Sequence, residues 1–286
     1  MFGLRTRQTD AEGHLAPGPF GRFSLHELIN SGGMADIWLA TDENNQPLAV
    51  RCLFSGRRAD ATARKRFVRG CKVLSEIDNH EFIIGYKEHG RIEGIHYLAM
   101  EYVEGTNLKL LMGSGDSLLE EQLGNLLIDS AIALEHVHES GYMHLDFKPE
   151  NVMVTRNGNV RLVDFDLALP RPEFARRLSS YPGTAAYMAP EQLQRAEVDH
   201  RADIFAFGVA AYELVTFQKP FPAETAAEVL RRQLDRGNDF VPPRSHNEAV
   251  PIALERIILK CLETDPDQRY PFMSVLVRDL QRALYL

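Results

Sequence analysis

The sequence has 286 residues, of which 44% are hydrophobic and 25% are charged, a composition typical of a globular protein with a sizeable core. Its formal net charge of −8 argues against a general binder of nucleic acid or of anionic membranes, which would need clustered positive charge. The three cysteines, Cys52, Cys71 and Cys261, lie far apart and form no C-x-x-C pair. Neither a zinc site nor a disulfide framework is therefore predicted.

The sequence also lacks the signals of membrane insertion and export. No apolar run approaches the roughly 18 residues of a membrane span, and the first residues lack the apolar stretch of a signal peptide. We therefore expect a cytoplasmic protein with no membrane segment in this chain. The sequence indicates no particular oligomeric state.

The first part of the chain is predicted to be a tail followed by a small lobe of strands. Residues 1–20 mix Thr, Gly, Pro and charged residues without periodicity, which predicts a mobile tail. In residues 21–101, short apolar or alternating runs predict antiparallel strands, and one stretch has helical spacing of apolar residues. The predicted elements are strands at residues 23–29, 36–41, 48–53, 85–91 and 95–101, and a helix at residues 59–77.

The rest of the chain, residues 102–286, is predicted to form a larger and mostly α-helical lobe. Two short strands, at residues 152–154 and 160–162, flank a turn that contains Asn-Gly, a sequence suited to positive φ. The fold class is therefore α+β with two lobes. The predicted helices lie at residues 119–138, 202–216, 225–236, 252–261 and 273–284.

Three short motifs in the second lobe indicate the chemistry. They are HLDFKPEN at residues 144–151, DFD at residues 164–166 and APE at residues 189–191. Phosphoryl transfer needs a carboxylate to orient the attacking hydroxyl, an Asn and an Asp to hold metal, and a cation near the transferred phosphate. All four residue types occur here in order. The sequence thus resembles the protein kinase family, and especially its bacterial Ser/Thr members, from about Phe23 to the C-terminus.

This resemblance implies the bilobal protein kinase fold and a role for each catalytic residue. Asp146 would orient the substrate hydroxyl, Lys148 would steady the γ-phosphate, and Thr184 would hydrogen-bond to both. Asn151 and Asp164 would hold Mg²⁺ or Mn²⁺. Each residue alone could be an ordinary turn residue or cap, but their common order makes coincidence a poor explanation.

The resemblance also implies two contacts that hold the large lobe together. Asp203 would hydrogen-bond to the backbone of the catalytic loop, and Arg269 would form a salt bridge with Glu191.

By the same resemblance the cofactor is ATP, bound mainly by the first lobe. The implied ATP-binding residues are Asn30, Gly32 and Gly33 in the phosphate loop, Ala49 and Arg51 in a strand, and Met100, Glu101 and Val103 at the hinge, where Glu101 and Val103 would offer backbone groups to adenine.

The phosphate-binding residues depart from the family pattern. Asn30 and Ala35 stand where the family has the first and third glycines of its phosphate loop. Arg51 stands where the family has the lysine that holds the α- and β-phosphates, and a planar guanidinium cannot occupy the position of an ammonium. The glutamate that would hold this lysine is missing from its two candidate positions, Gly70 and Cys71.

Two further departures lie near the metal and the activation loop. Leu145 replaces an arginine that, in regulated kinases, pairs with a phosphorylated activation loop, so we expect that transfer does not require this phosphorylation. We expect the Leu145 side chain simply to fill an apolar gap in the lobe. Asp166 replaces the glycine of D-F-G, and two interpretations stay open: an added metal carboxylate or a cap of the turn.

These features leave three functions open. The first is a Ser/Thr protein kinase-like, ATP-binding protein with weak or unconventional phosphoryl transfer to a protein substrate, which the complete catalytic set favours. The second is a catalytically inactive pseudokinase scaffold that regulates a protein partner, which the altered phosphate clamp favours. The third is transfer of another nucleotide moiety such as AMP.

Overall fold

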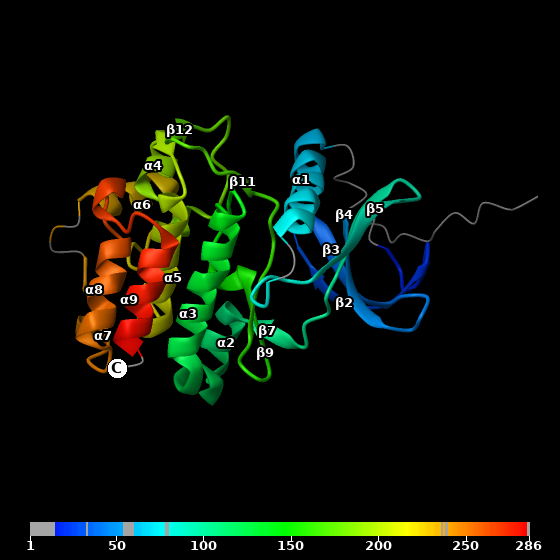
Figure 1. The fold of residues 1–286 in the computed structure, drawn as a ribbon, viewed down its shortest axis with the longest axis horizontal. Coiled ribbons are helices and arrows are strands. Elements are labelled where there is room, and N and C mark those ends of the chain that lie inside the picture. The colour runs from blue at the N-terminus through cyan, green and yellow to red at the C-terminus, as the bar shows by residue number, and fades with distance from the viewer. Residues whose placement is uncertain are drawn as a thin grey trace, which may run out of the picture. The chain divides into compact units, whose positions relative to one another are not determined.

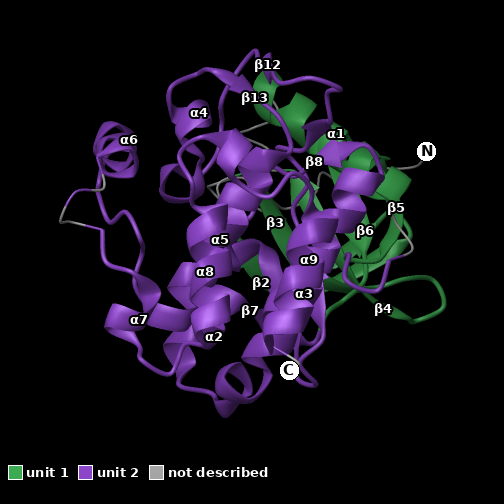
Figure 2. Ribbon diagram, turned by 60° about the vertical axis from the view of Figure 1, so that its left-hand side comes forward, with its two compact units in different colours: residues 1–79, 84–103 green, residues 80–83, 104–286 purple. Residues whose placement is uncertain are grey.

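The computed structural model describes residues 15–32, 34–53, 60–77, 80–235, 237 and 240–284. The chain divides into two compact units, coloured green and purple in Figure 2. Unit 1 comprises residues 1–79 and 84–103, and unit 2 comprises residues 80–83 and 104–286. The lobe boundary predicted between residues 101 and 102 stays a prediction.

The described residues of unit 1 form a six-stranded antiparallel sheet and one helix (Figure 1). The strands follow the order β1-β2-β3-β4-β6-β5. The elements of unit 1 are β1 (Gly18–Phe20), β2 (Phe23–Ser31), β3 (Ala35–Thr41), β4 (Pro47–Leu53), α1 (Ala61–Ile77), β5 (Tyr86–Ile92) and β6 (Ile95–Met100).

Strand β1 corrects one prediction. It lies in the segment 1–20 that the sequence pattern assigns to a mobile tail, yet Phe20 is fully buried and pairs with Phe23 of β2. Leu15 is also buried, and the Phe20 ring packs edge-on against Tyr97. These apolar side chains cover part of the sheet, so the tail prediction is wrong for residues 15–20. Residues 1–14 lie outside the described part of the chain.

The two faces of the unit 1 sheet have different coverings. On one face, Val50 and Cys52 of β4 join a buried cluster that includes Trp38 and Tyr97. Because side chains alternate along a strand, the intervening Arg51 points to the other face. The helix α1 packs against β5 and β6 through a stripe of buried residues at helical spacing.

Unit 2 is mostly helical, with short strands at its edges (Figure 1). Its strands form the sheets β10-β9-β7, β11-β8 and β12-β13. The elements are β7 (Gly105–Asn107), α2 (Leu108–Ser114), α3 (Ser117–Glu139), β8 (Tyr142–Met143), β9 (Val152–Thr155), β10 (Val160–Leu162), β11 (Leu169–Pro170), β12 (Arg176–Arg177), α4 (Pro190–Leu193), β13 (Glu197–Val198), α5 (Arg201–Thr216), α6 (Ala226–Leu234), α7 (Pro243–His246), α8 (Ile252–Cys261) and α9 (Met273–Leu284).

Helix α5 is the centre of unit 2. Nearly all of its residues are buried, as expected for a helix that is apolar on every side. Helix α8 packs against α5, while α9 packs against both α3 and α8. Every helix predicted for this lobe is present, and α8 and α9 begin and end as predicted. None of the described helices combines the length and the apolar composition needed to span a lipid bilayer.

Helix α3 carries a carboxyl group that makes stability depend on pH. Burial and, to a smaller extent, the Glu81 carboxylate raise the pKa of Asp129 to about 6, from 3.8 in the unfolded chain. The folded protein therefore binds this proton more tightly than the unfolded chain does. The contribution of Asp129 to stability must fall as pH rises from about 4 to about 6.

We expect Asp129→Asn to stabilise the fold more at about pH 7 than at about pH 4, because the amide cannot ionise. Urea denaturation at both pH values measures this difference. Asp116→Asn serves as the control, since Asp116 caps the exposed start of α3 and asparagine caps equally well. An equal gain at both pH values would show that ionisation of Asp129 is not the cause.

Candidate active site

A single buried carboxylate holds the catalytic loop, residues 144–151. Asp203, in the first turn of α5, is 0% exposed and accepts hydrogen bonds from the backbone N–H groups of His144 at 2.8 Å and Leu145 at 2.7 Å. His138 Nε2 donates a third at 2.8 Å. Burial raises the pKa of Asp203, but the hydrogen bond and charge of His138 and the other donors outweigh it and hold the pKa below its ordinary value. The predicted contact between Asp203 and the loop backbone is confirmed.

This carboxylate also stabilises an unfavourable backbone conformation. Leu145 has a φ of 61°, in the left-handed region that disfavours residues with a Cβ atom. The hydrogen bond from its N–H group to Asp203 fixes that conformation. The Leu145 side chain is buried, which agrees with the interpretation that it fills an apolar gap.

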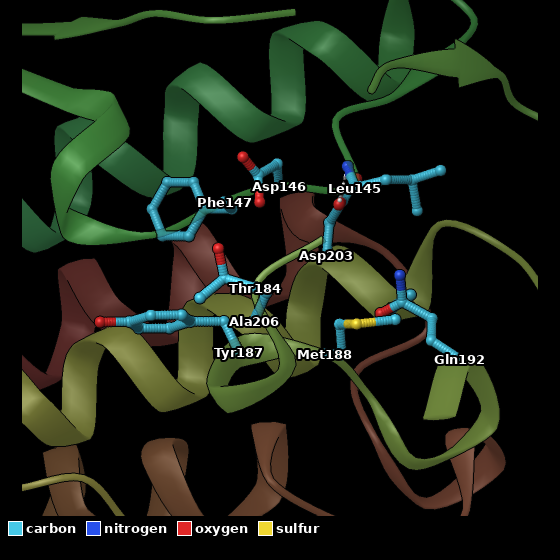
Figure 3. Close-up of a pocket in the computed structure, with 10 residues that line it drawn as sticks. Leu145, Asp146, Phe147, Thr184, Tyr187, Met188, Gln192, Asp203 and Ala206 are labelled. Atoms are coloured by element: carbon cyan, nitrogen blue, oxygen red, sulfur yellow. Dashed lines mark hydrogen bonds between the residues drawn. The ribbon is translucent and has the colours of Figure 1, made fainter. Parts of the chain in front are cut away.

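Four of the predicted side chains meet at the catalytic loop. Lys148 Nζ lies 3.0 Å from Asp146 Oδ2 and donates a hydrogen bond to Thr184 Oγ1 at 2.9 Å. Asn151 Nδ2 donates to the backbone oxygen of Asp146 at 2.8 Å and to its Oδ2 at 3.1 Å. Lys148 therefore joins Thr184 to Asp146. Figure 3 shows Asp146 and Thr184 on the wall of a small cavity between the catalytic loop and the activation segment.

Asp164 lies beside this cluster because three contacts tie the DFD turn to the catalytic loop. The N–H group of Val163 donates to the backbone oxygen of Asn151 at 2.9 Å. In return, His144 Nε2 lies 3.3 Å from the Val163 oxygen, and the His144 ring packs edge-on against Phe165 at 5.1 Å.

The donor set of this region fits a divalent metal. Asn151 uses its amide nitrogen for Asp146, so the amide oxygen is the atom it can present to a cation. Together with the Asp164 carboxylate, it would supply two oxygen ligands for a divalent cation whose shell phosphate oxygens and water complete. The N–H group of Asp166 lies 3.4 Å from Asp164 Oδ1, and its side chain is buried. A metal role for Asp166 stays a prediction.

A second buried pair fastens the APE motif. Arg269 donates to Glu191 Oε1 and Oε2 at 2.7 and 2.8 Å, and both residues are almost fully buried. The guanidinium also donates to backbone oxygens of Glu263, Thr264 and Arg201. Because a buried ion pair is stable only when such additional donors are satisfied, this arrangement is well formed. The predicted salt bridge is confirmed.

The phosphate loop predicted in unit 1 is the connection between β2 and β3. Asn30 pairs with Ile37 across these strands, and the Gly32 N–H group donates to the Ala35 oxygen at 3.1 Å. The hairpin therefore forms although Asn30 and Ala35 replace two glycines of the family pattern. Gly33 lies outside the described residues.

The predicted adenine-binding residues lie at the end of β6. Met100 pairs with Ala49 of β4. The Glu101 N–H group donates to the Gly85 oxygen at 2.7 Å, and the Gly85 N–H group donates back to Glu101 Oε2 at 3.1 Å. The backbone N–H group of Glu101 is therefore already used in a hydrogen bond within unit 1. Val103 is the last residue of unit 1.

Arg51 has an aromatic neighbour. Its guanidinium carbon lies 5.3 Å from the centre of the Phe67 ring on α1, a cation–π distance. Phe67 precedes Gly70 and Cys71 by three and four positions, so all three share one helix face, and all three are buried. This face offers Arg51 an aromatic ring where the family has a carboxylate.

Comparison with known proteins identifies the family. The sequence matches the protein kinase domain over residues 23–280. The chain belongs to the protein kinase domain family. It is 33% identical over 272 residues to a probable serine/threonine-protein kinase of Streptomyces coelicolor. It is 29% identical over 265 residues to the serine/threonine-protein kinase PrkC of Bacillus subtilis, and 28% identical over 270 residues to PknB of Mycobacterium tuberculosis.

These alignments include 92% of this chain but only 40% of the Streptomyces and Bacillus kinases and 43% of the mycobacterial kinase. The similarity to these protein kinases therefore concerns one part of longer proteins.

Two contacts of this kinase domain had no signal in the sequence pattern. His138 lies on α3 with no ligand spacing, and only the fold brings it to Asp203. Phe67 is one apolar residue among several on α1, and only its position on the helix face selects it as the neighbour of Arg51.

We expect Asp203→Asn to lower the free energy of unfolding by about 2 to 4 kcal/mol, because an amide cannot accept all of the buried hydrogen bonds. Urea denaturation measures this loss. The control is Asp267→Asn. Because Asp267 is exposed, loss of its salt bridge with Arg201 should lower the free energy of unfolding by about 1 kcal/mol or less. Equal losses in the two variants would mean that Asp203 does not hold the catalytic loop.

Proposed function

We propose that this chain is a Ser/Thr protein kinase that transfers the γ-phosphoryl group of ATP to a hydroxyl group of a protein substrate. The observation that carries the proposal is the hydrogen-bonded cluster of Asp146, Lys148, Asn151 and Thr184. Positioning and charge stabilisation make up most of the catalysis of phosphoryl transfer, so an assembled cluster of these residue types supports this activity. The names of the relatives agree with it.

Each residue of the cluster has a role that suits its contacts. The Asp146 carboxylate would accept a hydrogen bond from the substrate hydroxyl and orient it for attack. Lys148, which lies between Asp146 and Thr184, would neutralise charge on the transferred phosphate. Asn151 and Asp164 would hold Mg²⁺ or Mn²⁺. The bound metal supplies further charge neutralisation at the phosphates.

We infer weak or unconventional phosphoryl transfer from the altered phosphate-binding residues. Arg51 retains the positive charge, but the planar guanidinium beside Phe67 cannot reproduce the lysine–glutamate geometry. We infer that it contacts the phosphates through a different approach, with slower transfer as the consequence. The lobe predicted at residues 21–101 would bind the nucleotide, and the lobe at residues 102–286 would carry out phosphoryl transfer. We propose that the protein is cytoplasmic.

A pseudokinase scaffold is the second candidate. The observation that favours it is the pair Gly70 and Cys71, which are buried on α1 and provide no carboxylate for the phosphate clamp. In that case the domain would bind a protein partner without modifying it. Transfer of AMP is the third candidate, since a shifted triphosphate would expose another phosphorus atom to attack.

Mass spectrometry separates the three functions. The purified chain is incubated with ATP, either Mg²⁺ or Mn²⁺, and a basic protein substrate. We expect phosphate on Ser or Thr, and a loss of about a hundredfold or more in Asp146→Asn, because the oriented carboxylate is removed. An adenylate adduct supports AMP transfer, and nucleotide binding without any adduct supports the scaffold.

Asp116→Asn is the matched control for this experiment, since it makes the same change at a distant cap in unit 2. It should retain full transfer. Unchanged incorporation in Asp146→Asn would contradict the proposed role of the cluster.

The Arg51–Phe67 contact is tested by a double-mutant cycle on ATP affinity. We expect Arg51→Met and Phe67→Leu each to weaken ATP binding, Phe67→Leu by about threefold or more, because the ring orients the guanidinium. The double variant should bind ATP no more weakly than Arg51→Met alone.

Arg51→Lys should not restore ordinary kinase activity, because the glutamate that would hold this lysine is missing as well.

The control is Phe20→Leu, which truncates a buried ring in the cluster on the opposite face of the sheet. It should lower stability without changing ATP affinity. Additive effects of Arg51→Met and Phe67→Leu would show that the ring does not act through Arg51.

A further inference from the structure

The activation segment, between the DFD and APE motifs, is joined to the rest of unit 2 by a very short strand pair. β12 pairs with β13 in antiparallel register, with Arg176 opposite Val198 and Arg177 opposite Glu197. Two-residue strands form a marginal pair even though Val198 is buried, since the other three side chains are exposed and opposite charges across the pair add little. Other contacts must therefore keep this segment in one position.

Tyr181 provides such a contact at the end of the strand pair. Its Oη accepts a hydrogen bond from the Leu178 N–H group at 2.9 Å and donates one to the Ala196 oxygen at 2.6 Å. Leu178 follows β12 and Ala196 precedes β13, so the register makes them the next opposing pair. The phenol oxygen thus bridges an N–H group and a C=O group at the point where the direct pairing ends.

The bridge lies close in sequence to the catalytic cluster. Thr184 follows Tyr181 by three residues, and its hydroxyl accepts the hydrogen bond from Lys148. Between them, Gly183 has a φ of 145°, and a Cβ atom there would lie 3.3 Å from the Met188 side chain. Only glycine suits this turn. Tyr181 therefore fixes one end of a short stretch whose other end contacts the catalytic loop.

These contacts need no charged group. Leu145, at the position of the phosphate-binding arginine of regulated kinases, is apolar and buried, so it cannot pair with a phosphate. We propose that Tyr181 is a positioning residue that orders the activation segment through its hydroxyl group and thereby presents Thr184 to Lys148, without phosphorylation of the segment. Only the expected effect on transfer rests on the proposed function. The ordering of the segment does not.

Hydrogen exchange of the full chain, after phosphatase treatment, tests the ordering directly. In Tyr181→Phe, which keeps the ring and removes only the hydroxyl, the amides of residues 176–181 should exchange about tenfold faster than in the wild type. Tyr212→Phe is the matched control, because Tyr212 Oη also donates to a backbone oxygen of unit 2, that of Val241 at 2.7 Å. It should leave exchange in residues 176–181 unchanged.

Two results would overturn the role of Tyr181. One is equal exchange in residues 176–181 for Tyr181→Phe and Tyr212→Phe, and the other is unprotected amides there in the dephosphorylated wild type. A kinetic readout accompanies them: Tyr181→Phe should raise KM for the protein substrate several-fold while the Kd for ATP stays the same, which a general loss of stability would not produce. If the wild type transfers no phosphate, the proposed function is wrong. The exchange rates then still support or overturn the role of Tyr181 in ordering the segment.

Discussion

The buried carboxylate of Asp203 is the constraint on which the candidate active site of unit 2 depends. It accepts hydrogen bonds from the backbone of His144 and Leu145 and from the His138 ring, at a site without solvent access. A buried anion is stable only when several donors surround it, so the carboxylate and the loop determine each other's position. The left-handed backbone at Leu145, and with it the direction of the following Asp146, is a consequence.

A second buried charged group, the Arg269–Glu191 pair, holds the activation segment. The Arg269–Glu191 pair anchors the APE motif, while Thr184 contacts Lys148 and Tyr187 donates a hydrogen bond to Glu213. Each contact joins residues that are distant in sequence. The catalytic loop and the activation segment are therefore held by the interior of one unit, through α5 and the helices around it.

The contrast between the two units has a physical explanation. In unit 2 the predicted site residues share buried or partly buried hydrogen bonds, so removal of a partner would leave another polar group without that bond. In unit 1, Arg51 lies beside the Phe67 ring, and the residues at the candidate glutamate positions, Gly70 and Cys71, are small and buried. Loss of the lysine–glutamate pair thus remains compatible with a well-packed lobe.

The sequence by itself determined the fold class, the order of the motifs and most long elements, because helical periodicity and strand alternation are local; α8 and α9 were predicted to the residue. The family pattern likewise selected Asp203 and the Glu191–Arg269 pair. Only the tertiary structure decided which side chains meet across long separations, such as His138 with Asp203, Arg51 with Phe67, and Tyr181 with Ala196. It also decided that Gly18–Phe20 is a strand. A short segment without periodicity has no preferred structure until an apolar sheet face is present to cover.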